Sequence, residues 1–282
     1  MKHLIWRERA KHLWTRINDD EIFGRAAQLS YYFLLALFPL LLFLITLLGY
    51  FAEAGSEFRA KLLRYLATVM PSAAVTLVYT TLDEISSARG GGKLSIGLLA
   101  ALWAASNGMG AISQTLNIAY NVKETRSWWK VHLTSVLLTV ALSVLIICAL
   151  AIILYGGVIG NALAARLGLS SAFKIAWSIL QWPIALIFVL ATFNLIYNFA
   201  PNILPKERRW STPGALVGVA LWLAISFGFR IYLHFFNSYS ITYGSLGALI
   251  VLMLWFYLTG VAILVGGEIN CELDERCEKV VG

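Results

Sequence analysis

Six long apolar runs constrain the fold of this chain more than any other feature of its sequence. An α-helix rises about 1.5 Å per residue, so about 20 consecutive apolar residues span the hydrocarbon core of a bilayer. The sequence therefore predicts an all-α, polytopic membrane protein with six transmembrane helices in a single membrane domain, residues 1–282. The predicted spans are Leu29–Phe51, Leu94–Ala119, Leu133–Ile159, Ile175–Phe199, Gly214–Phe236 and Leu246–Gly267.

The composition provides too few charges to cover the surface of a soluble protein. Of the 282 residues, 59% are hydrophobic and 13% are charged, whereas soluble domains carry about 25% charged residues. Cationic loops of a membrane protein explain the net charge of +7 better than nucleic-acid binding does, because no basic run is interleaved with aromatic residues. We therefore expect the lipid bilayer as a partner, and no nucleic acid.

The distribution of lysine and arginine predicts the orientation in the membrane. With the N-terminus inside, fourteen of the 22 basic residues fall on the cytoplasmic side and seven on the outer side, and Arg230 is left within a span. Cationic loops are retained in the cytoplasm, so both termini are expected there.

Three segments outside the spans have a predicted character. Residues 1–24 carry tryptophan and aliphatic residues at helical spacing among cations, which predicts an interfacial helix on an anionic membrane surface. A solvated helix packed on the loops fits this pattern as well. Residues 52–93 contain two apolar stripes around a proline and predict a helical hairpin on the outer face. Residues 268–282 form a predicted cytoplasmic tail, and residues 18–21 are expected to supply the N-cap and first-turn acids of the first span.

Polar residues within the spans define the candidate binding site. The second span carries Asn107, Gln114, Asn117 and Asn121 at helical spacing, and we expect them on one face. The fourth span repeats this with asparagines at 194, 198 and 202. A polar cavity open to the cytoplasm is one interpretation; the other is that the amides only bind helices together, for roughly 1 kcal/mol each. The residues predicted for a substrate-binding cavity are Gln28, Asn107, Gln114, Asn117, Asn194, Asn198, Arg230 and Glu268.

Arg230 and Glu268 are the charged members of this predicted site. Arg230 lies near the outer end of the fifth span, where its head could reach the interface or pair with a buried group. Glu268 ends the sixth span, where a carboxylate faces the unfavourable end of the helix dipole. We expect a compensating partner for it, such as Arg25 or a cation of a lipid headgroup.

The sequence offers little catalytic chemistry. It has no Walker lysine loop, no HExxH or CxxC spacing, and no carboxylate in the middle of a span. The four histidines are scattered. We therefore expect no enzyme activity, no catalytic residues, no cofactor and no metal.

Several motifs together resemble those of a known family. The stretch Ala26–Pro39 is similar to the first-span signature of the YihY/BrkB family of bacterial inner-membrane proteins. Further matches are Leu116–Val122, Phe193–Tyr197 with Pro201, Tyr243–Ala248 and Gly266–Asn270, in the same order over nearly the whole chain. Ala36 and Gly267 depart from the pattern but keep a small residue. The resemblance implies a six-span protein of the bacterial inner membrane, serum resistance in some members and envelope lipid traffic; the family was once labelled a ribonuclease.

These observations lead to two functional hypotheses. The first is a transporter or flippase-like protein for an amphipathic or anionic envelope molecule such as a lipid, with anionic lipid headgroups as partners. The second is a non-transporting membrane scaffold that organises an envelope complex. A homo-oligomer is compatible with either, and no sequence feature decides it.

Overall fold

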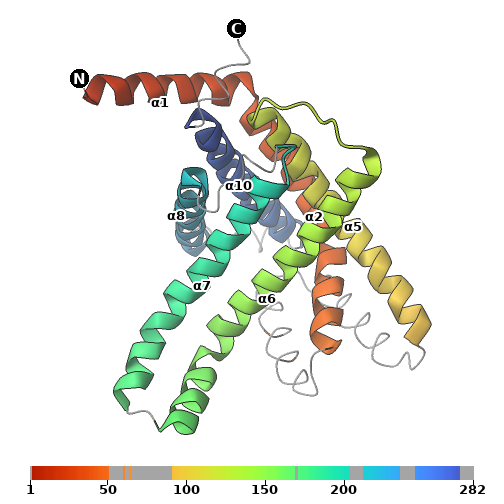
Figure 1. Cartoon of the computed structure of the whole chain (residues 1–282), viewed down its shortest axis with the longest axis vertical. Coiled ribbons are helices and arrows are strands. Elements are labelled where there is room, and N and C mark those ends of the chain that lie inside the picture. The colour runs from red at the N-terminus through yellow and green to blue at the C-terminus, as the bar shows by residue number, and fades with distance from the viewer. Residues whose placement is uncertain are drawn as a thin grey trace.

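The computed structural model describes residues 2–50, 60, 64, 91–168, 171–203, 212–235 and 245–273. This part of the chain contains helices and no strand, as predicted. Its long helices are α1 (Lys2–Asp19), α2 (Ile22–Tyr50), α5 (Gly91–Ala119), α6 (Trp128–Leu167), α7 (Ser171–Phe199), α8 (Pro213–Phe235) and α10 (Ser245–Glu272) (Figure 1). The predicted outer hairpin lies almost entirely outside these residues.

Four of these helices contain segments long and apolar enough to cross a membrane. The segments are Trp128–Arg166, Phe173–Phe199, Pro213–Leu233 and Leu249–Glu272, which belong to α6, α7, α8 and α10. In lipid every backbone polar group needs an internal partner, and the helix supplies it within one segment. α2 and α5 have 29 residues each and pack beside them, but their crossing, and with it the count of six spans, stays a prediction.

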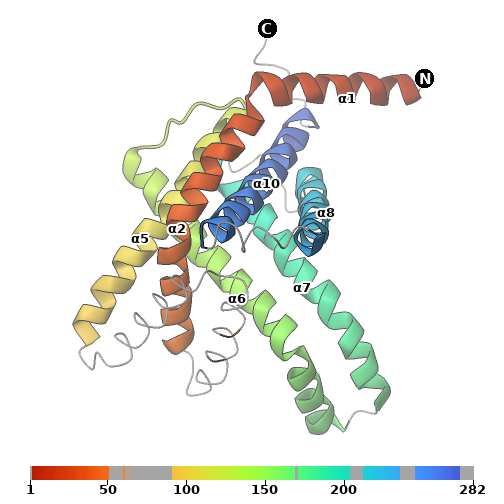
Figure 2. The same ribbon diagram turned by 180° about the vertical axis from the view of Figure 1, so that it is seen from behind.

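The helices meet at one end of the bundle, beneath α1. α2, α6 and α8 begin at this end, whereas α5, α7 and α10 finish there, and α1 lies across it (Figure 1). Neighbouring helices in contact include α6 with α7, α8 with α10, and α2 with both α5 and α10 (Figure 2). We call this the α1 end; the positive charge of its loops makes it the predicted cytoplasmic end.

Small residues allow the closest helix contacts. A Cβ atom added at Gly214 of α8 would overlap the Gly266 carbonyl of α10 and the Asn270 side chain. A Cβ at Gly260 would lie 3.3 Å from the backbone of Ala26, where α10 crosses α2. Glycine at these positions therefore sets the distance between the helices, as small residues do in membrane bundles.

The apolar core lies near the α1 end and is shared by several helices. Its most buried large side chains include Leu29 of α2, Leu116 of α5, Tyr197 of α7 and Leu264 of α10. The Tyr197 hydroxyl donates to the Ile263 carbonyl at 2.7 Å, so the ring packs among apolar residues without leaving its polar tip unpaired.

Two boundaries differ from the sequence prediction. α1 continues to Asp19 and α2 begins at Ile22, so the predicted acids precede α2 and its first turn contains none. Glu21 adopts a left-handed conformation with φ of 50° between the two helices. At the other terminus α10 extends to Glu272, so residues 268–272 belong to a helix instead of the predicted tail. Hydropathy predicts where the apolar segment ends, and a helix can continue beyond that point.

Candidate functional site

A polar pocket lies between α2, α5 and α6. Its volume is about 380 Å³, and its polar lining residues are Tyr32, Ser106, Asn107, Gln114, His132 and Ser135. The side chains of Asn107 and Gln114 are exposed. In the described part of the chain neither amide has a protein hydrogen-bond partner, and Tyr32, 39% exposed, has none for its hydroxyl. These groups therefore leave hydrogen-bonding capacity in the pocket that the described protein does not use.

An aromatic cluster borders the pocket at the start of α6. The ring of His132 stacks on Trp103 at a centroid distance of 5.1 Å and lies 4.1 Å from the ring of Trp128. Trp128 and Trp129 also contact each other at 4.5 Å, and both are more than half exposed. Exposed tryptophans are typical of the membrane–water interface. Their position indicates that the pocket lies close to the level of the lipid headgroups.

A second, apolar pocket adjoins the first on the side away from the α1 end. It has a volume of about 190 Å³ and is lined mainly by aliphatic and aromatic residues such as Phe33, Leu40, Leu142 and Ile146. Ala36 lines both pockets. α6 runs away from the α1 end, so Leu142 and Ile146 lie about 10–17 Å farther along this helix than Ser135 at the helical rise. The two pockets have Ala36 in common; the first is partly polar, whereas the second is apolar.

The buried Glu268 pairs with a cation from α1. Arg16 Nη2 lies 3.1 Å from Glu268 Oε2, and the same guanidinium donates to the Ala119 carbonyl at 3.0 Å. Glu268 is fully buried and Arg16 is 17% exposed. The prediction of Arg25 as this partner is wrong, because Arg25 donates to the Asp20 carbonyl at 2.7 Å. The compensating cation thus comes from the helix lying across the bundle, not from the entering span.

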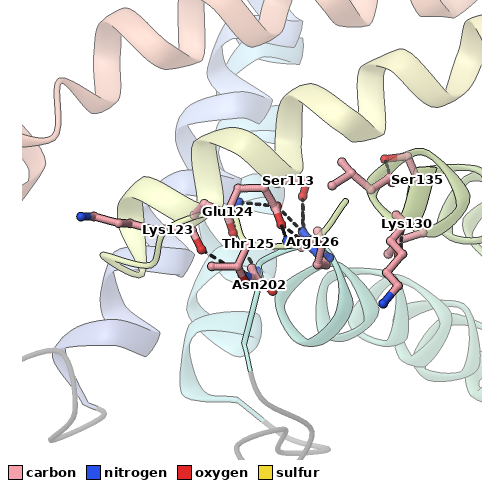
Figure 3. Close-up of polar contacts among 12 residues, drawn as sticks. Ser113, Lys123, Glu124, Thr125, Arg126, Lys130, Ser135 and Asn202 are labelled. Carbon is pink, nitrogen blue, oxygen red and sulfur yellow. Dashed lines mark hydrogen bonds and ion pairs between the residues drawn. The ribbon is translucent and has the colours of Figure 1, made fainter. Parts of the chain in front are cut away.

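Asn117 is the centre of a separate network at the end of α5. Its Nδ2 donates to Glu124 Oε2 at 2.9 Å, and its Oδ1 accepts from the Asn202 backbone N–H at 2.7 Å. Asn202 Nδ2 in turn donates to the Lys123 carbonyl and to Thr125 Oγ1 (Figure 3). The Asn117 side chain therefore joins the ends of α5 and α7 to the loop that precedes α6.

Arg126 holds that loop in place. Its guanidinium donates to Glu124 at 2.7 Å, to Ser113 Oγ at 3.1 Å and to the Ala200 carbonyl at 3.0 Å (Figure 3). The hydrogen bond from the Arg126 side chain is the main cause that lowers the pKa of the Glu124 carboxyl to about 2. The loop leads directly into Trp128 and His132, so this ion pair positions the residues that border the pocket.

The predicted polar stripe of the second span divides in the structure. Asn107 and Gln114 reach the pocket, whereas Asn117 is buried in the loop network and Asn121 lies beyond the helix with φ of 51°. Two bonds end α5 there, from the Asn121 N–H to the Ile118 carbonyl and from the Val122 N–H to the Asn117 carbonyl. This pattern is a Schellman turn with asparagine in the left-handed position. The expectation of one common face is therefore wrong, since the helix ends before Asn121.

The predicted stripe of the fourth span also ends early. Asn198 donates through Nδ2 to the Asn194 carbonyl at 2.8 Å, one turn back on α7. α7 finishes at Phe199, so Asn202 belongs to the loop network instead. Asn198 is 6% exposed, and neither Asn194 nor Asn198 lines the polar pocket.

The remaining predicted site residues lie apart from the pocket. Gln28 is exposed on α2, one turn before Tyr32. Arg230 is exposed on α8, about 25 Å along the helix from Pro213 at the helical rise. Among the described residues no group of three or more histidine, cysteine or acidic side chains is arranged to hold a metal ion.

Sequence reasoning missed several residues of the site. His132 and Ser135 line the pocket from α6. His132 lies just before the predicted third span, and Ser135 lies in its first turn. The WW pair at 128 and 129 marks the interface and precedes them, and it is the signal that would have led there. Arg16 belongs to a segment interpreted as amphipathic, which gave no sign of a buried partner.

Comparison with known proteins identifies relatives over most of the chain. A Bacillus subtilis (strain 168) protein named ribonuclease-like protein YfkH is 40% identical over 266 residues, covering 94% of this chain and 95% of that protein. UPF0761 membrane proteins of Xanthomonas oryzae and Xanthomonas axonopodis are each 29% identical, and the chain spans about 60% of their length. No solved structure matches the chain.

The resemblance noted from the sequence motifs is confirmed at the level of the family. The family described as virulence factor BrkB matches residues 13–280, which include all the helices that surround the pocket. Its relatives include proteins named as membrane proteins, in agreement with the apolar helices. The chain is therefore a membrane protein that belongs to the virulence factor BrkB family.

Proposed function

We propose that this protein binds an amphipathic envelope lipid between α2, α5 and α6 and moves it through the membrane as a transporter or flippase-like protein. The observation that carries the proposal is the pair of adjoining pockets, polar near the aromatic cluster and apolar farther from the α1 end. A lipid is likewise polar at its headgroup and apolar along its acyl chains. Its headgroup therefore fits the first pocket and its acyl chain the second.

The chemistry of the polar pocket supports binding more than catalysis. The polar residues that line it in the described part of the chain carry amides, hydroxyls and one imidazole, and none of them is a carboxylate. A hydrolase needs a nucleophile with an oriented base, or a metal, and the lining offers no such arrangement. The proposal therefore includes no nuclease activity, although one relative is named ribonuclease-like. It also includes no nucleotide hydrolysis, because the sequence lacks a Walker loop.

The test is lipid movement in reconstituted vesicles. Purified protein is inserted into phosphatidylethanolamine vesicles with a trace of lipid whose acyl chain carries a nitrobenzoxadiazole dye. Dithionite bleaches the dye only in the outer leaflet, so continued bleaching reports movement from the inner leaflet. Parallel samples contain labelled phosphatidylglycerol or labelled glucosyl diacylglycerol. We expect the protein to accelerate movement of at least one of them.

A matched pair of substitutions links that movement to the apolar pocket. Ile146 lines the apolar pocket and is 36% exposed, whereas Val144 on the same helix is 46% exposed and does not line it. Ile146→Trp should fill the apolar pocket and slow movement at least fivefold, while Val144→Trp should leave it unchanged. Failure of the parent protein to move either lipid would reject transport and favour the scaffold. Equal rates for both variants would place the path elsewhere.

A further inference from the structure

We infer that the polar pocket recognises an uncharged polyhydroxyl headgroup, the sugar of a glycosyl diacylglycerol, in preference to a phosphate. This inference rests on the proposed function for its site and adds the chemical class of the ligand. It differs from the anionic headgroup that net charge alone suggests.

The first argument is the match of donors and acceptors. Asn107 and Gln114 each offer an N–H₂ group and a carbonyl oxygen, and the Tyr32 hydroxyl both donates and accepts. The Ser135 hydroxyl already donates to the Val131 carbonyl at 2.9 Å, which leaves its oxygen as an acceptor. Sugar hydroxyls also donate and accept, so they can satisfy both kinds of group. An ionised phosphate offers mainly acceptors, and it would leave these oxygens facing negative charge.

The second argument is the placement of the cations. Among the described residues no lysine or arginine lines the pocket. Arg126 is committed to Glu124 and Ala200, and the ammonium group of Lys130 points away from Ser135 (Figure 3). A phosphate removed from water normally requires a cation or several charge-assisted hydrogen bonds. Among the described residues the pocket supplies no lysine or arginine for this purpose.

The third argument is the aromatic border. Trp103 is 42% exposed and Trp128 55% exposed, and both contact the ring of His132, which lines the pocket. The C–H faces of a pyranose are apolar and pack on such rings, while its hydroxyls reach the amides. His132 Nδ1 faces the Trp128 carbonyl at 3.3 Å. A carbonyl only accepts, so this nitrogen carries the proton, and in the neutral ring Nε2 is an acceptor for a further hydroxyl.

The experiment compares three lipids with identical acyl chains by native mass spectrometry of the full-length protein in detergent. The probes are monoglucosyl diacylglycerol, phosphatidic acid and unmodified diacylglycerol. We expect the glucosyl lipid to bind at least tenfold more tightly than the other two. Gln114→Leu and Tyr32→Phe should each weaken its binding at least fivefold and leave diacylglycerol binding unchanged. Asn161→Leu, an exposed amide near the far end of α6, serves as the control and should change nothing.

The outcomes separate this inference from the proposed function. Preference for phosphatidic acid, equal binding of all three lipids, or no effect of Gln114→Leu and Tyr32→Phe would overturn the headgroup assignment. Lipid movement in vesicles could still occur in each of those cases. Selective binding of the glucosyl lipid without movement would uphold the headgroup assignment and reject transport.

Discussion

Arg16 of α1 lies 3.1 Å from Glu268 of α10, although 252 residues separate them in the sequence. The carboxylate is fully buried, whereas the guanidinium keeps 17% of its surface exposed. Desolvating a carboxylate without a nearby cation is costly. This contact therefore helps to hold α1 across the end of the bundle, together with the hydrogen bond from Arg16 to the Ala119 carbonyl.

Removing the cation should destabilise the protein strongly. Arg16→Met leaves Glu268 buried without its partner, and we expect a loss of about 3 kcal/mol, measured by thermal unfolding in detergent. His12→Gln is the control, because His12 is 57% exposed in its pair with Glu272 and should contribute less than about 1 kcal/mol. Adding Glu268→Gln to Arg16→Met should recover part of the loss. Equal losses for Arg16→Met and His12→Gln would contradict the importance of the buried pair.

The two kinds of amide on α5 should respond differently to substitution. Asn117→Ala removes the partner of Glu124 and of the Asn202 N–H, so we expect a loss of about 1–3 kcal/mol. Gln114→Ala removes a side chain that bonds to no described protein group, and stability should change by less than about 0.5 kcal/mol. Thermal unfolding of the two variants side by side measures the difference. A Gln114 variant as unstable as the Asn117 variant would mean that both amides bind helices together.

The Glu124–Arg126 pair should make stability depend on acid pH. The pKa of the Glu124 carboxyl is about 2 in the folded chain against 4.5 ordinarily. The pair therefore stabilises the folded state above about pH 4.5. That contribution is lost progressively as the pH falls from 4.5 towards 2. Melting temperatures recorded over this range should fall less steeply for Glu124→Gln than for the parent. Parallel curves would show that the carboxyl titrates alike in both states.

Two glycines of α8 provide a matched test of helix packing. Gly214→Ala should destabilise the protein, because the new Cβ overlaps the Gly266 carbonyl and the Asn270 side chain. Backbone atoms cannot move aside cheaply, so a loss of about 1–3 kcal/mol is expected. Gly228→Ala meets no atom within 4 Å and should be neutral or slightly stabilising. The amounts of folded protein after mild heating distinguish the two.

The predicted orientation can be checked on a single helix. In a variant whose three native cysteines are replaced by serine, a cysteine at Ser127 should resist an impermeant thiol reagent applied to intact cells. A cysteine at Asn161, which is exposed near the other end of α6, should react. The expectation follows from the distribution of lysine and arginine. Labelling of Ser127→Cys alone would reverse the topology.

Hydropathy predicted the helices well because each is a local property of the chain. α7 and α8 finish within a residue of their predicted ends, since the same residues that prefer lipid also form the helix. The earlier starts of α6 and α7 were missed, because helices continue through the interface, where the composition is no longer apolar.

The site was less predictable because its partners are distant in sequence. Helical spacing placed Asn107, Gln114 and Asn117 on one helix correctly, but it could not show that the Asn121 turn directs the chain back to Asn117. The pairing of Arg16 with Glu268 depends on how α1 crosses the bundle, and no local pattern encodes that angle. Tertiary placement, not residue type, separated the pocket amides from the structural ones.

The length of α6 has a consequence for the membrane that holds the protein. Its 40 residues measure about 60 Å, roughly twice the thickness of the hydrocarbon core. Even at the largest usual tilt of about 40°, the helix exceeds that core by about 15 Å. Either the α6–α7 hairpin protrudes from the bilayer, or the lipid around it thickens. In the second case the protein would favour the thicker regions of its membrane.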